Sequence, residues 1–507
     1  MPLFHYRKFF TLASLAIITA FTVQAADKDD HFNEMTIATP YPLIQSVIAA
    51  DLLISEGKEL VTFSIDEHKN RWLMIYAYNG VSKQYEVKEK AILPKKFHHF
   101  DLSETQQTLA GKKQQNLYFT SANALYRYQA GQFVPLTQYS SIYLQSEAEF
   151  IQRGNFVQDL NDDEFADIIV TDFKETLLLL GAADNQFTKQ SLPIKPRVTI
   201  NGMGANYAPI KLYFSDVNFD KKTDIAQVGD GEIFIYTQLN NGQFSLLPTI
   251  INVNDTISGY EWWTKKDDSG EQLDQSNLVY RKLDELRDVN ADGITDMVVR
   301  YTKASGVLDR VNDYEIYLGK KQQDELIFST SANSVIRAEG TLTGLQFIDI
   351  DNDKKLEVLL SGFDIGLSQI IGALVAGSID QDVYIFKMNA SDNYEEKPNI
   401  SKEVELNFSL TSGQSGSAIV QLADITGDGL KELILSEDDD ELLIYRGQAG
   451  KKSFAKRSRS FETLLPKDGN LVSVTDLNND GKEDLLMNFS NLDGKDSKNK
   501  FKILLAQ

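Results

Sequence analysis

The chain has 507 residues, with 73 Asp and Glu against 51 Lys and Arg and no Cys, so its formal net charge is −22. A chain without Cys forms no disulfides and carries no cysteine-linked lipid anchor. Because phosphate binding needs clustered Lys and Arg, the acidic composition argues against nucleic acid as a partner.

Residues 1–25 are predicted to be a secretory signal peptide. Arg7 and Lys8 form a basic start, residues 9–23 are apolar, and Val23-Gln24-Ala25 fits a small-residue cleavage site. A retained membrane anchor is the alternative, but the apolar run is shorter than the ~20 residues of a spanning helix. We therefore expect an exported protein, either periplasmic, secreted or at the cell surface, whose residues 26–507 form one domain without a transmembrane segment.

The rest of the chain consists of repeated pairs of short strands separated by turns. Two weak repeats come first, one with Asp51 and Glu59 and one around Asp101, and six stronger repeats follow. Their strands are rich in Ile, Val, Leu, Tyr and Phe, as in residues 232–236 and 441–445. No segment has a helical period over three turns. Four strands in every ~50–60 residues are typical of propeller blades.

This pattern predicts an all-β fold, a β-propeller of eight blades with four antiparallel strands each. Seven blades is the alternative, if the Asp51 repeat is spurious. The last repeat ends near Lys502 without room for a fourth strand. A strand near residues 35–41 is predicted to pair with this last blade and close the ring, which removes the exposed sheet edges.

Six nine-residue segments have carboxylates at positions 1, 5 and 9 and an Asn, Asp or Thr at position 3. Oxygen atoms at alternating positions of a tight loop converge on one point, which suits Ca²⁺ with its six to eight oxygen ligands. Position 6 must bend sharply, and position 7 offers its backbone carbonyl. We predict up to six Ca²⁺ ions, held by Asp159, Asn161, Asp163, Phe165 and Asp167; Asp216, Asn218, Asp220, Lys222 and Asp224; Asp288, Asn290, Asp292, Ile294 and Asp296; Asp349, Asp351, Asp353, Lys355 and Glu357; Asp424, Thr426, Asp428, Leu430 and Glu432; and Asp476, Asn478, Asp480, Lys482 and Asp484.

Two other interpretations of these segments exist. Asp and Asn clusters also form turns without a metal. An EF-hand is excluded, because its closing Glu stands at position 12 on a helix, whereas here the closing carboxylate stands at position 9 and a strand follows.

The six segments resemble the FG-GAP/VCBS repeats of bacterial exported proteins and the calcium-bearing blades of the integrin α-subunit propeller. The resemblance implies that each calcium loop joins the first and second strands of a blade, on the lower face of the propeller. It is specific for fold and metal and unspecific for activity. The Phe-Gly and Gly-Ala-Pro signatures of the family are poorly kept, with Gly154, Gly229 and Gly362 as remnants.

A protein or glycan ligand is expected on the upper face, opposite the calcium loops, where long connections gather. Residues 252–282 contain the ligand candidates Tyr260, Trp262 and Trp263, residues 302–313 contain Arg310, and residues 362–382 form an apolar loop. Exposed aromatic rings suit sugar stacking or a protein anchor; the alternative is that they are buried. Adjacent Trp residues in an extended segment are expected to point opposite ways.

Two classes of function stay open. The first is a non-enzymatic, calcium-stabilised binding, adhesion or envelope scaffold module. The second is a polysaccharide-active, lyase-like enzyme, which would need a Tyr or His base with Arg or Lys to neutralise the substrate carboxylate. His98 and His99 are adjacent on a predicted inner strand and are expected to point to opposite faces. A cationic cleft bearing Tyr or His would favour the enzyme, and an apolar aromatic patch would favour the binder.

Overall fold

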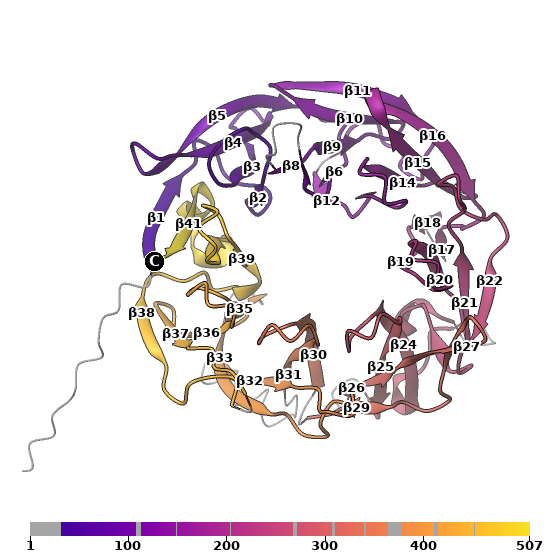
Figure 1. Ribbon diagram of the computed structural model, residues 1–507. Helices are drawn as coiled ribbons and strands as arrows, with labels where there is room; N and C mark the ends of the chain where they lie inside the picture. Colours follow the sequence, from indigo (N-terminus) through magenta and orange to yellow (C-terminus); the bar gives the residue numbers. More distant parts are fainter. Residues whose placement is uncertain are drawn as a thin grey trace, which may run out of the picture.

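The computed structural model describes residues 32–507 except 108–112, 149, 203, 267–270, 307–309, 339–340, 364–377, 410–413 and 451. The predicted signal peptide, residues 1–25, and most of the predicted loop 362–382 lie outside the described residues. Eight sheets stand around a central axis (Figure 1). The chain is therefore an all-β propeller with eight blades, as the repeats predict.

The first four blades follow one another along the chain. Blade 1 consists of β2 (Ile48–Ala50), β3 (Glu59–Ile65), β4 (Arg71–Asn79) and β5 (Gln84–Leu93). Blade 2 consists of β6 (His99–Leu102), β9 (Leu117–Thr120), β10 (Ala124–Gln129) and β11 (Gln132–Gln138). Blade 3 consists of β13 (Val157–Gln158), β14 (Asp167–Thr171), β15 (Thr176–Ala182) and β16 (Gln186–Leu192). Blade 4 consists of β19 (Leu212–Ser215), β20 (Asp224–Val228), β21 (Glu232–Tyr236) and β22 (Thr249–Asn252).

The last four blades complete the ring. Blade 5 consists of β24 (Leu278–Arg287), β25 (Asp296–Ala304), β26 (Arg310–Tyr317) and β29 (Ser334–Ile336). Blade 6 consists of β30 (Thr341–Ile348), β31 (Glu357–Phe363), β32 (Ser378–Phe386) and β33 (Ile400–Ser409). Blade 7 consists of β35 (Val420–Ala423), β36 (Glu432–Glu437), β37 (Glu441–Tyr445) and β38 (Arg459–Glu462). Blade 8 consists of β39 (Val472–Thr475), β40 (Asp484–Asn488), β41 (Lys500–Ala506) and β1 (Phe32–Ala38).

The fourth strand of blade 8 comes from the other end of the described chain. β1 pairs antiparallel with β41 over its whole length, from Phe32 opposite Ala506 to Ala38 opposite Lys500. It begins three residues before the range 35–41 that the sequence analysis proposed. Phe501 and Ile503 of β41 also pack with Leu60 and Met74 of blade 1, so apolar contacts join the first and last blades.

Shorter elements decorate the blades. β12 (Gln152–Arg153) pairs parallel with β6 as a fifth strand of blade 2, on the axis side. The remaining short strands are β7 (Gln106–Gln107), β8 (Lys113–Gln114), β17 (Arg197–Asn201), β18 (Gly204–Ala208), β23 (Ile257–Ser258), β27 (Gly319–Gln322), β28 (Glu325–Phe328) and β34 (Gln414–Ser415). Among the described residues, the helices are 3-10 turns: η1 (Ala183–Asn185), η2 (Trp262–Thr264), η3 (Gln275–Asn277), η4 (Gly469–Leu471), η5 (Asn491–Asp493) and η6 (Lys495–Asn499). In the described part of the chain, no helix has the length and apolar character to cross a membrane.

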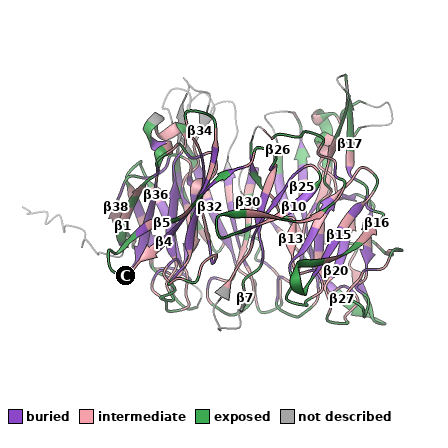
Figure 2. Cartoon of the chain, turned by 90° about the horizontal axis from the view of Figure 1, so that it is seen from above, coloured by how far each residue is buried: buried purple, intermediate pink, exposed green. Residues whose placement is uncertain are grey.

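The two faces of the ring carry different connections. In the side view, the β17–β18 hairpin and β34, which belong to blade-to-blade connections, lie at one face, and β7 and β27 lie at the other (Figure 2). We call the first the upper face and the second the lower face. The prediction of an upper-face loop over residues 302–313 is wrong for most of this range. Residues 296–304 and 310–317 are strands, and Ala304 pairs with Arg310, because the β25–β26 hairpin continues through the buried Thr302 and Asn312, whose side chains bond to each other at 2.8 Å.

Candidate functional site

All six predicted metal loops lie between the first and second strand of a blade. They connect β13 to β14, β19 to β20, β24 to β25, β30 to β31, β35 to β36 and β39 to β40. Each loop ends where its position 9 carboxylate begins the second strand. The loops therefore belong to blades 3 to 8, on the lower face.

The loops share one set of hydrogen bonds from backbone N–H groups to carboxylates. The position 1 carboxylate accepts the N–H of position 6 in every loop, at 2.8 to 3.0 Å, and the donors are Glu164, Lys221, Gly293, Lys354, Gly429 and Gly481. The position 5 carboxylate likewise accepts the N–H of position 7, at 2.8 to 3.0 Å, from Phe165, Lys222, Ile294, Lys355, Leu430 and Lys482. The carboxylates of positions 1 and 5 are therefore held in the same place in all six loops.

The backbone bends at two positions of every loop. Position 4 is left-handed at Asp162, Phe219, Ala291, Asn352, Gly427 and Asn479. Position 6 is left-handed as well, with a φ of 66° at Glu164, 66° at Lys221, 72° at Lys354 and 80° to 87° at the three glycines. An L-residue with a side chain is strained at such angles by roughly 1 kcal/mol or more. Strain repeated at the same position of several loops points to a function that requires the bend.

The position 9 carboxylates are buried, with at most 2 % of their surface exposed. In every loop one oxygen accepts the N–H of position 2, as Asp167 does from Leu160 at 2.9 Å and Asp484 from Leu477 at 2.7 Å. In five loops the other oxygen accepts an N–H beside the third strand, for example that of Gly181 at 2.6 Å. A Cβ at Gly181 would lie 2.5 Å from the carbonyl oxygen of Ala166, so only glycine fits this approach.

Burial disfavours the charged form of the position 9 carboxylates. It raises the pKa of Asp167, Asp296 and Asp484 to about 7, and the carboxylates at positions 1 and 5 add to the shift. The same burial raises the pKa of Glu357 and Glu432 to about 7. Each oxygen that accepts one N–H has a further lone pair, with which it can bind a cation.

Several loop oxygens are buried without a partner. Among the described residues, Oδ1 of Asp288, Oδ1 of Asp351 and Oγ1 of Thr426 accept no hydrogen bond. These atoms stand at position 1 or 3 of their loops. One ligand oxygen each from Asp349, Asp351 and Asp353 also lies within 4.8 Å of the others. Buried oxygens without partners and converging carboxylates form the donor set that a hard cation takes, so the residues fit Ca²⁺.

The loops differ in the side-chain cations beside them. Nζ of Lys387 lies 2.6 Å from Oδ2 of Asp351, and both side chains are about five-sixths buried. Weaker contacts exist in two other loops, from Arg446 to Asp428 at 3.5 Å and from Lys222 to Asp220 at 3.8 Å. The Asp349 loop is thus the one among the described residues with a buried ammonium group bonded to its position 3 carboxylate.

The two weak repeats form blades 1 and 2. Glu59 accepts the N–H of Leu52, which is the same contact between positions 9 and 2, but Leu53 and Ser55 replace the intermediate oxygens. Asp101 lies within β6, and its Oδ2 accepts the N–H groups of Phe156 and Val157 at 2.8 and 3.0 Å. Its carboxylate therefore joins blade 2 to blade 3.

The two Trp candidates do not lie in an extended segment, so that expectation is wrong. Trp262 and Trp263 belong to the 3-10 turn η2, because the N–H groups of Thr264 and Lys265 bond back to Glu261 and Trp262. Their rings meet edge to face with centroids 5.4 Å apart. Trp263 is 48 % exposed and Trp262 is partly buried. Tyr260 lines a cavity of about 480 Å³ with Lys195, Arg197 and Lys265, whereas Arg310 is not among its lining residues.

The two His side chains do not point to opposite faces as expected. Both rings contact Tyr143, with centroids 5.5 Å away for His98 and 4.8 Å for His99. The blade-to-blade connection after β11 folds back over them, so local strand alternation does not decide their environment. Burial, with the nearby His98, lowers the pKa of His99 to about 4.

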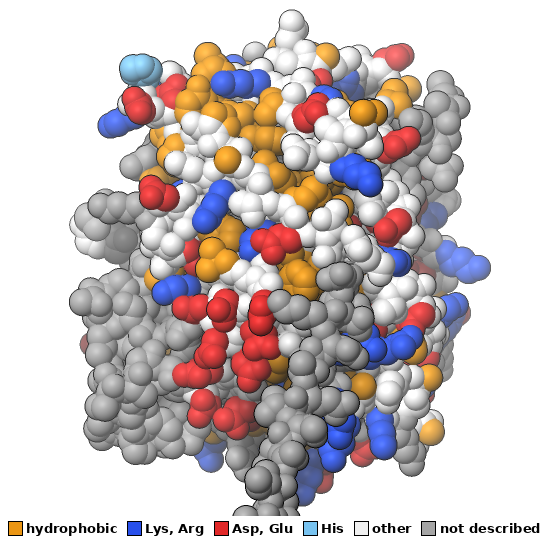
Figure 3. Space-filling view, turned by 90° about the vertical axis from the view of Figure 1, so that its left-hand side faces the viewer, with side chains coloured by type: hydrophobic (Ala, Val, Ile, Leu, Met, Phe, Trp, Pro, Cys, Tyr) orange, Lys and Arg blue, Asp and Glu red, His pale blue; other side chains and the backbone are white. Residues whose placement is uncertain are grey.

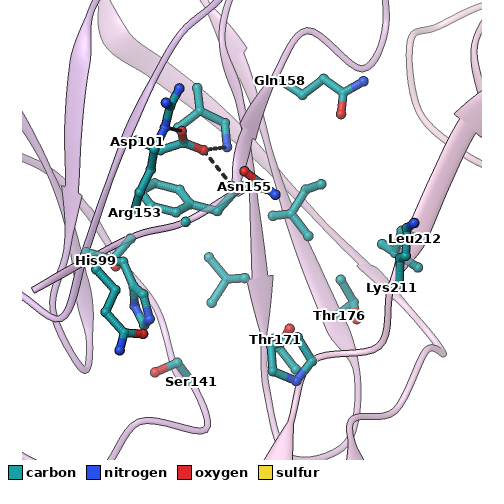
Figure 4. Close-up of a pocket in the computed structure, with 18 of the residues that line it drawn as sticks. His99, Asp101, Ser141, Arg153, Asn155, Gln158, Thr171, Thr176, Lys211 and Leu212 are labelled. Atoms are coloured by element: carbon teal, nitrogen blue, oxygen red, sulfur yellow. Dashed lines mark hydrogen bonds and ion pairs between the residues drawn. The ribbon is translucent and has the colours of Figure 1, made fainter. Parts of the chain in front are cut away.

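His99 also lines a cavity of about 780 Å³ that the sequence analysis missed (Figure 4). Its walls come from blades 2, 3 and 4 and include Asp101, Tyr143, Arg153, Asn155 and Leu212. Figure 4 shows His99 and Arg153 on one wall and Leu212 opposite. Tyr143, Arg153 and Asn155 belong to the connection between blades 2 and 3, which does not repeat along the chain, so the blade period could not identify them. The polar residues Gln152, Arg153 and Asn155 of this connection were the sequence signal that could have done so.

Comparison with known proteins supports the repeat type. Residues 424–487, which hold the Asp424 and Asp476 loops, match the FG-GAP-like repeat family. Together with the eight-bladed fold, this match confirms the resemblance to an FG-GAP repeat propeller. No curated protein matches the chain.

Solved structures of low sequence identity are similar to the chain. The chain is similar to an Agrocybe aegerita lectin that recognises non-reducing terminal N-acetylglucosamine, at 15 % identity and a TM-score of 0.41 over 83 % of this chain and 94 % of that chain. It is also similar to the Pseudomonas aeruginosa periplasmic gluconolactonase PpgL, at 11 % identity and a TM-score of 0.33 over 83 % and 96 % of the two chains. Likenesses at this level carry no argument about a ligand or an activity.

Proposed function

We propose that the protein is an exported, calcium-stabilised propeller that acts as a binding, adhesion or envelope scaffold module. The observation that carries the calcium proposal is the set of buried, unpartnered oxygens at Asp288, Asp351 and Thr426. Leaving such atoms without a partner lowers the stability of the folded state, and a bound cation removes that cost. The shared left-handed bends at positions 4 and 6 support the same conclusion.

Calcium-dependent stability tests this proposal. A ligand that binds only the folded state stabilises it by about 2.7 kcal/mol per site at a hundredfold excess over its Kd. We expect a clear rise in the melting temperature between EDTA and millimolar Ca²⁺, and several ions per chain by plasma emission spectroscopy. An unchanged melting temperature together with less than one bound ion would overturn the proposal.

We propose that the ligand, a protein or a glycan, binds on the upper face. Rigid blades with long connections are where binding residues concentrate, and Tyr260 with the half-exposed Trp263 lies on such a connection. Trp263→Ala should change the melting temperature little but weaken capture of a glycan or an envelope extract. Trp262→Ala should cost more stability, because that ring is partly buried against Trp263. Equal, large losses of stability in both variants would show that the pair is structural.

A polysaccharide-active, lyase-like enzyme is the second candidate. One cavity brings together Tyr143, His99 and Arg153, which are the residue types that proton abstraction beside a carboxylate needs. The lowered pKa keeps the His99 ring in its neutral form at neutral pH, as a base requires, but it also makes the ring a weaker base. The test is the ultraviolet absorbance of unsaturated products from uronate-containing polysaccharides. Turnover that His99→Gln and Tyr143→Phe both abolish would favour the enzyme, and no turnover would favour the binder.

A further inference from the structure

Two cavities on the upper face share one wall residue. The His99 cavity and the Tyr260 cavity are both lined by Ile210, which leads into β19. The first extends over the inner strands of blades 2 and 3, and the second reaches the connection between blades 4 and 5. We call the two together the upper-face groove. Two adjacent cavities of about 780 and 480 Å³ suit a chain of several units better than one small molecule.

Among the described residues, three cationic side chains of the groove have no strong partner. Arg153 lines the His99 cavity with about half of its side chain exposed, and its nearest carboxylate, that of Asp101, lies 3.9 Å away. Lys195 and Arg197 line the Tyr260 cavity, and Nε of Arg197 is buried without a hydrogen bond. Lys265 differs, because its ammonium group is paired with Asp230 at 2.8 Å. Arg153, Lys195 and Arg197 can therefore take a ligand anion without first breaking a close ion pair.

The His99 cavity also offers neutral polar groups and an aromatic wall. Asn155, Gln158 and Thr171 line it, and the structure records no hydrogen bond from their side chains to other described residues. The partly buried Tyr143 ring stands beside them. Side-chain amides and hydroxyls match the hydroxyl groups of a sugar, and an aromatic ring matches its apolar face.

Most of the acidic charge of the chain lies outside the groove, whose lining contains the carboxylates of Asp101 and Asp230. Six carboxylate loops occupy the lower face, and Figure 3 shows Asp and Glu gathered on the side of the ring that carries β1 and β38, away from blades 2 to 4. Glu437, Asp438 and Asp440 are exposed on that side. A five-residue strand such as β14 spans ~16 Å, whereas the Debye length at physiological salt is ~8 Å. Local cations therefore dominate the potential in the groove.

We infer that the upper-face groove binds an acidic oligosaccharide. One carboxylate pairs with the Arg153 guanidinium, a second pairs with Arg197 and Lys195 beyond Ile210, and a sugar face packs on Tyr143. The inference rests on the proposed function in placing the ligand on this face, and it adds the chemical class of that ligand. Arginine is suited to this role because its planar guanidinium binds carboxylates through two parallel hydrogen bonds. A neutral glycan would leave the three cations unpaired.

The test compares two forms of one probe by calorimetry on the calcium-loaded full chain. The probes are tetragalacturonate and its fully methyl-esterified form, which has the same sugar units but no charge. We expect the acid to bind at least tenfold more tightly than the ester. Arg153→Gln and Arg197→Gln should each weaken acid binding about tenfold and leave ester binding unchanged, since one lost charge-assisted bond accounts for a factor of this size. Lys320→Gln, an exposed lysine on β27 at the lower face, is the matched control and should change neither.

The outcomes separate this inference from the proposed function. Equal binding of acid and ester, no binding of either at millimolar concentration, or acid binding that survives both Arg substitutions would overturn the inference, while ion counting would still decide the calcium proposal. Conversely, acid-selective binding by a chain that holds no calcium would support the inference and contradict the calcium proposal. Unchanged melting temperatures of the two Arg variants would show that their effect is local.

Discussion

The carboxylate of Glu59 accepts the backbone N–H of Leu52 at 2.6 Å, in a blade whose loop lacks the intermediate metal-type oxygens. In blade 8 the corresponding carboxylate of Asp484 accepts the N–H of Leu477 at 2.7 Å. The contact between positions 9 and 2 therefore holds a blade together without any cation. We infer that the position 9 carboxylate has a structural role that does not depend on metal binding. The residues at positions 1, 3 and 5 then distinguish a metal loop from an ordinary one.

Glu59→Ala should destabilise the protein by roughly 2–3 kcal/mol, with the same loss in EDTA and in millimolar Ca²⁺. Glu59 is fully buried and accepts three hydrogen bonds, from the N–H groups of Leu52 and Leu53 and from the Ser55 hydroxyl. Removing it leaves these donors unpaired. Chemical denaturation in the two buffers measures the effect. A loss that appears only with calcium would mean that blade 1 holds an ion after all.

Asp292→Ala and Asp480→Ala should each remove one bound ion, and Asp51→Ala and Asp101→Ala should remove none. Asp292 and Asp480 stand at position 5 of complete loops, and their Oδ1 atoms accept the position 7 N–H groups at 2.8 and 2.9 Å. Asp51 lies in a loop without intermediate oxygens, and Asp101 lies in a strand. Plasma emission spectroscopy counts the ions in all four variants. An equal loss in all four would show that the weak repeats bind metal too.

The repeats of this chain could be predicted from the sequence because each copy carries its own turn and strand residues. Strands β21 and β37 span the predicted residues 232–236 and 441–445. The upper-face groove could not be predicted from the sequence, because Tyr143, Arg153 and Ile210 come together only when three blades pack around the axis. The turn at Trp262 and Trp263 was likewise missed, since its 3-10 hydrogen bonds have no apolar period to reveal them.

Lys387→Met should raise the calcium affinity of the Asp349 loop, by about tenfold if the ammonium competes directly with the ion. The Nζ of Lys387 donates hydrogen bonds to Asp351 at 2.6 Å and Ser453 at 3.2 Å, so its positive charge offsets part of the negative charge of the loop carboxylates. Without it the carboxylates repel one another more strongly, and the calcium-free protein should melt at a lower temperature. Calcium titration followed by calorimetry measures the change. Lys355→Met is the control, because its ammonium pairs with Asp392 outside the loop; an equal gain in both variants would contradict competition by Lys387.

Lys354→Gly should stabilise the protein by roughly 0.5–1 kcal/mol, because it removes a side chain from a left-handed residue at position 6. Lys354 has a φ of 72°, and the glycines of the other loops adopt similar angles at no steric cost. Lys320→Gly in β27 is the control and should lower stability, since glycine weakens a strand. Denaturant midpoints compare the two. A loss of stability in Lys354→Gly would mean that its side chain makes a contribution larger than the backbone strain.

His99 should make the protein less stable as the pH falls below neutral. Burial and the neighbouring His98 lower its pKa to about 4, from 6.5 in the unfolded chain. Between these values the unfolded state binds more protons, so the free energy of unfolding rises with pH and is lost as the pH falls through 6.5 towards 4. From about pH 7.5 to pH 5 the loss should be about 2 kcal/mol. His99→Gln removes this group, so the difference in unfolding free energy between the wild type and the variant should change by that amount across the range. A difference that does not vary with pH would show that His99 is protonated as readily in the folded protein as in the unfolded chain.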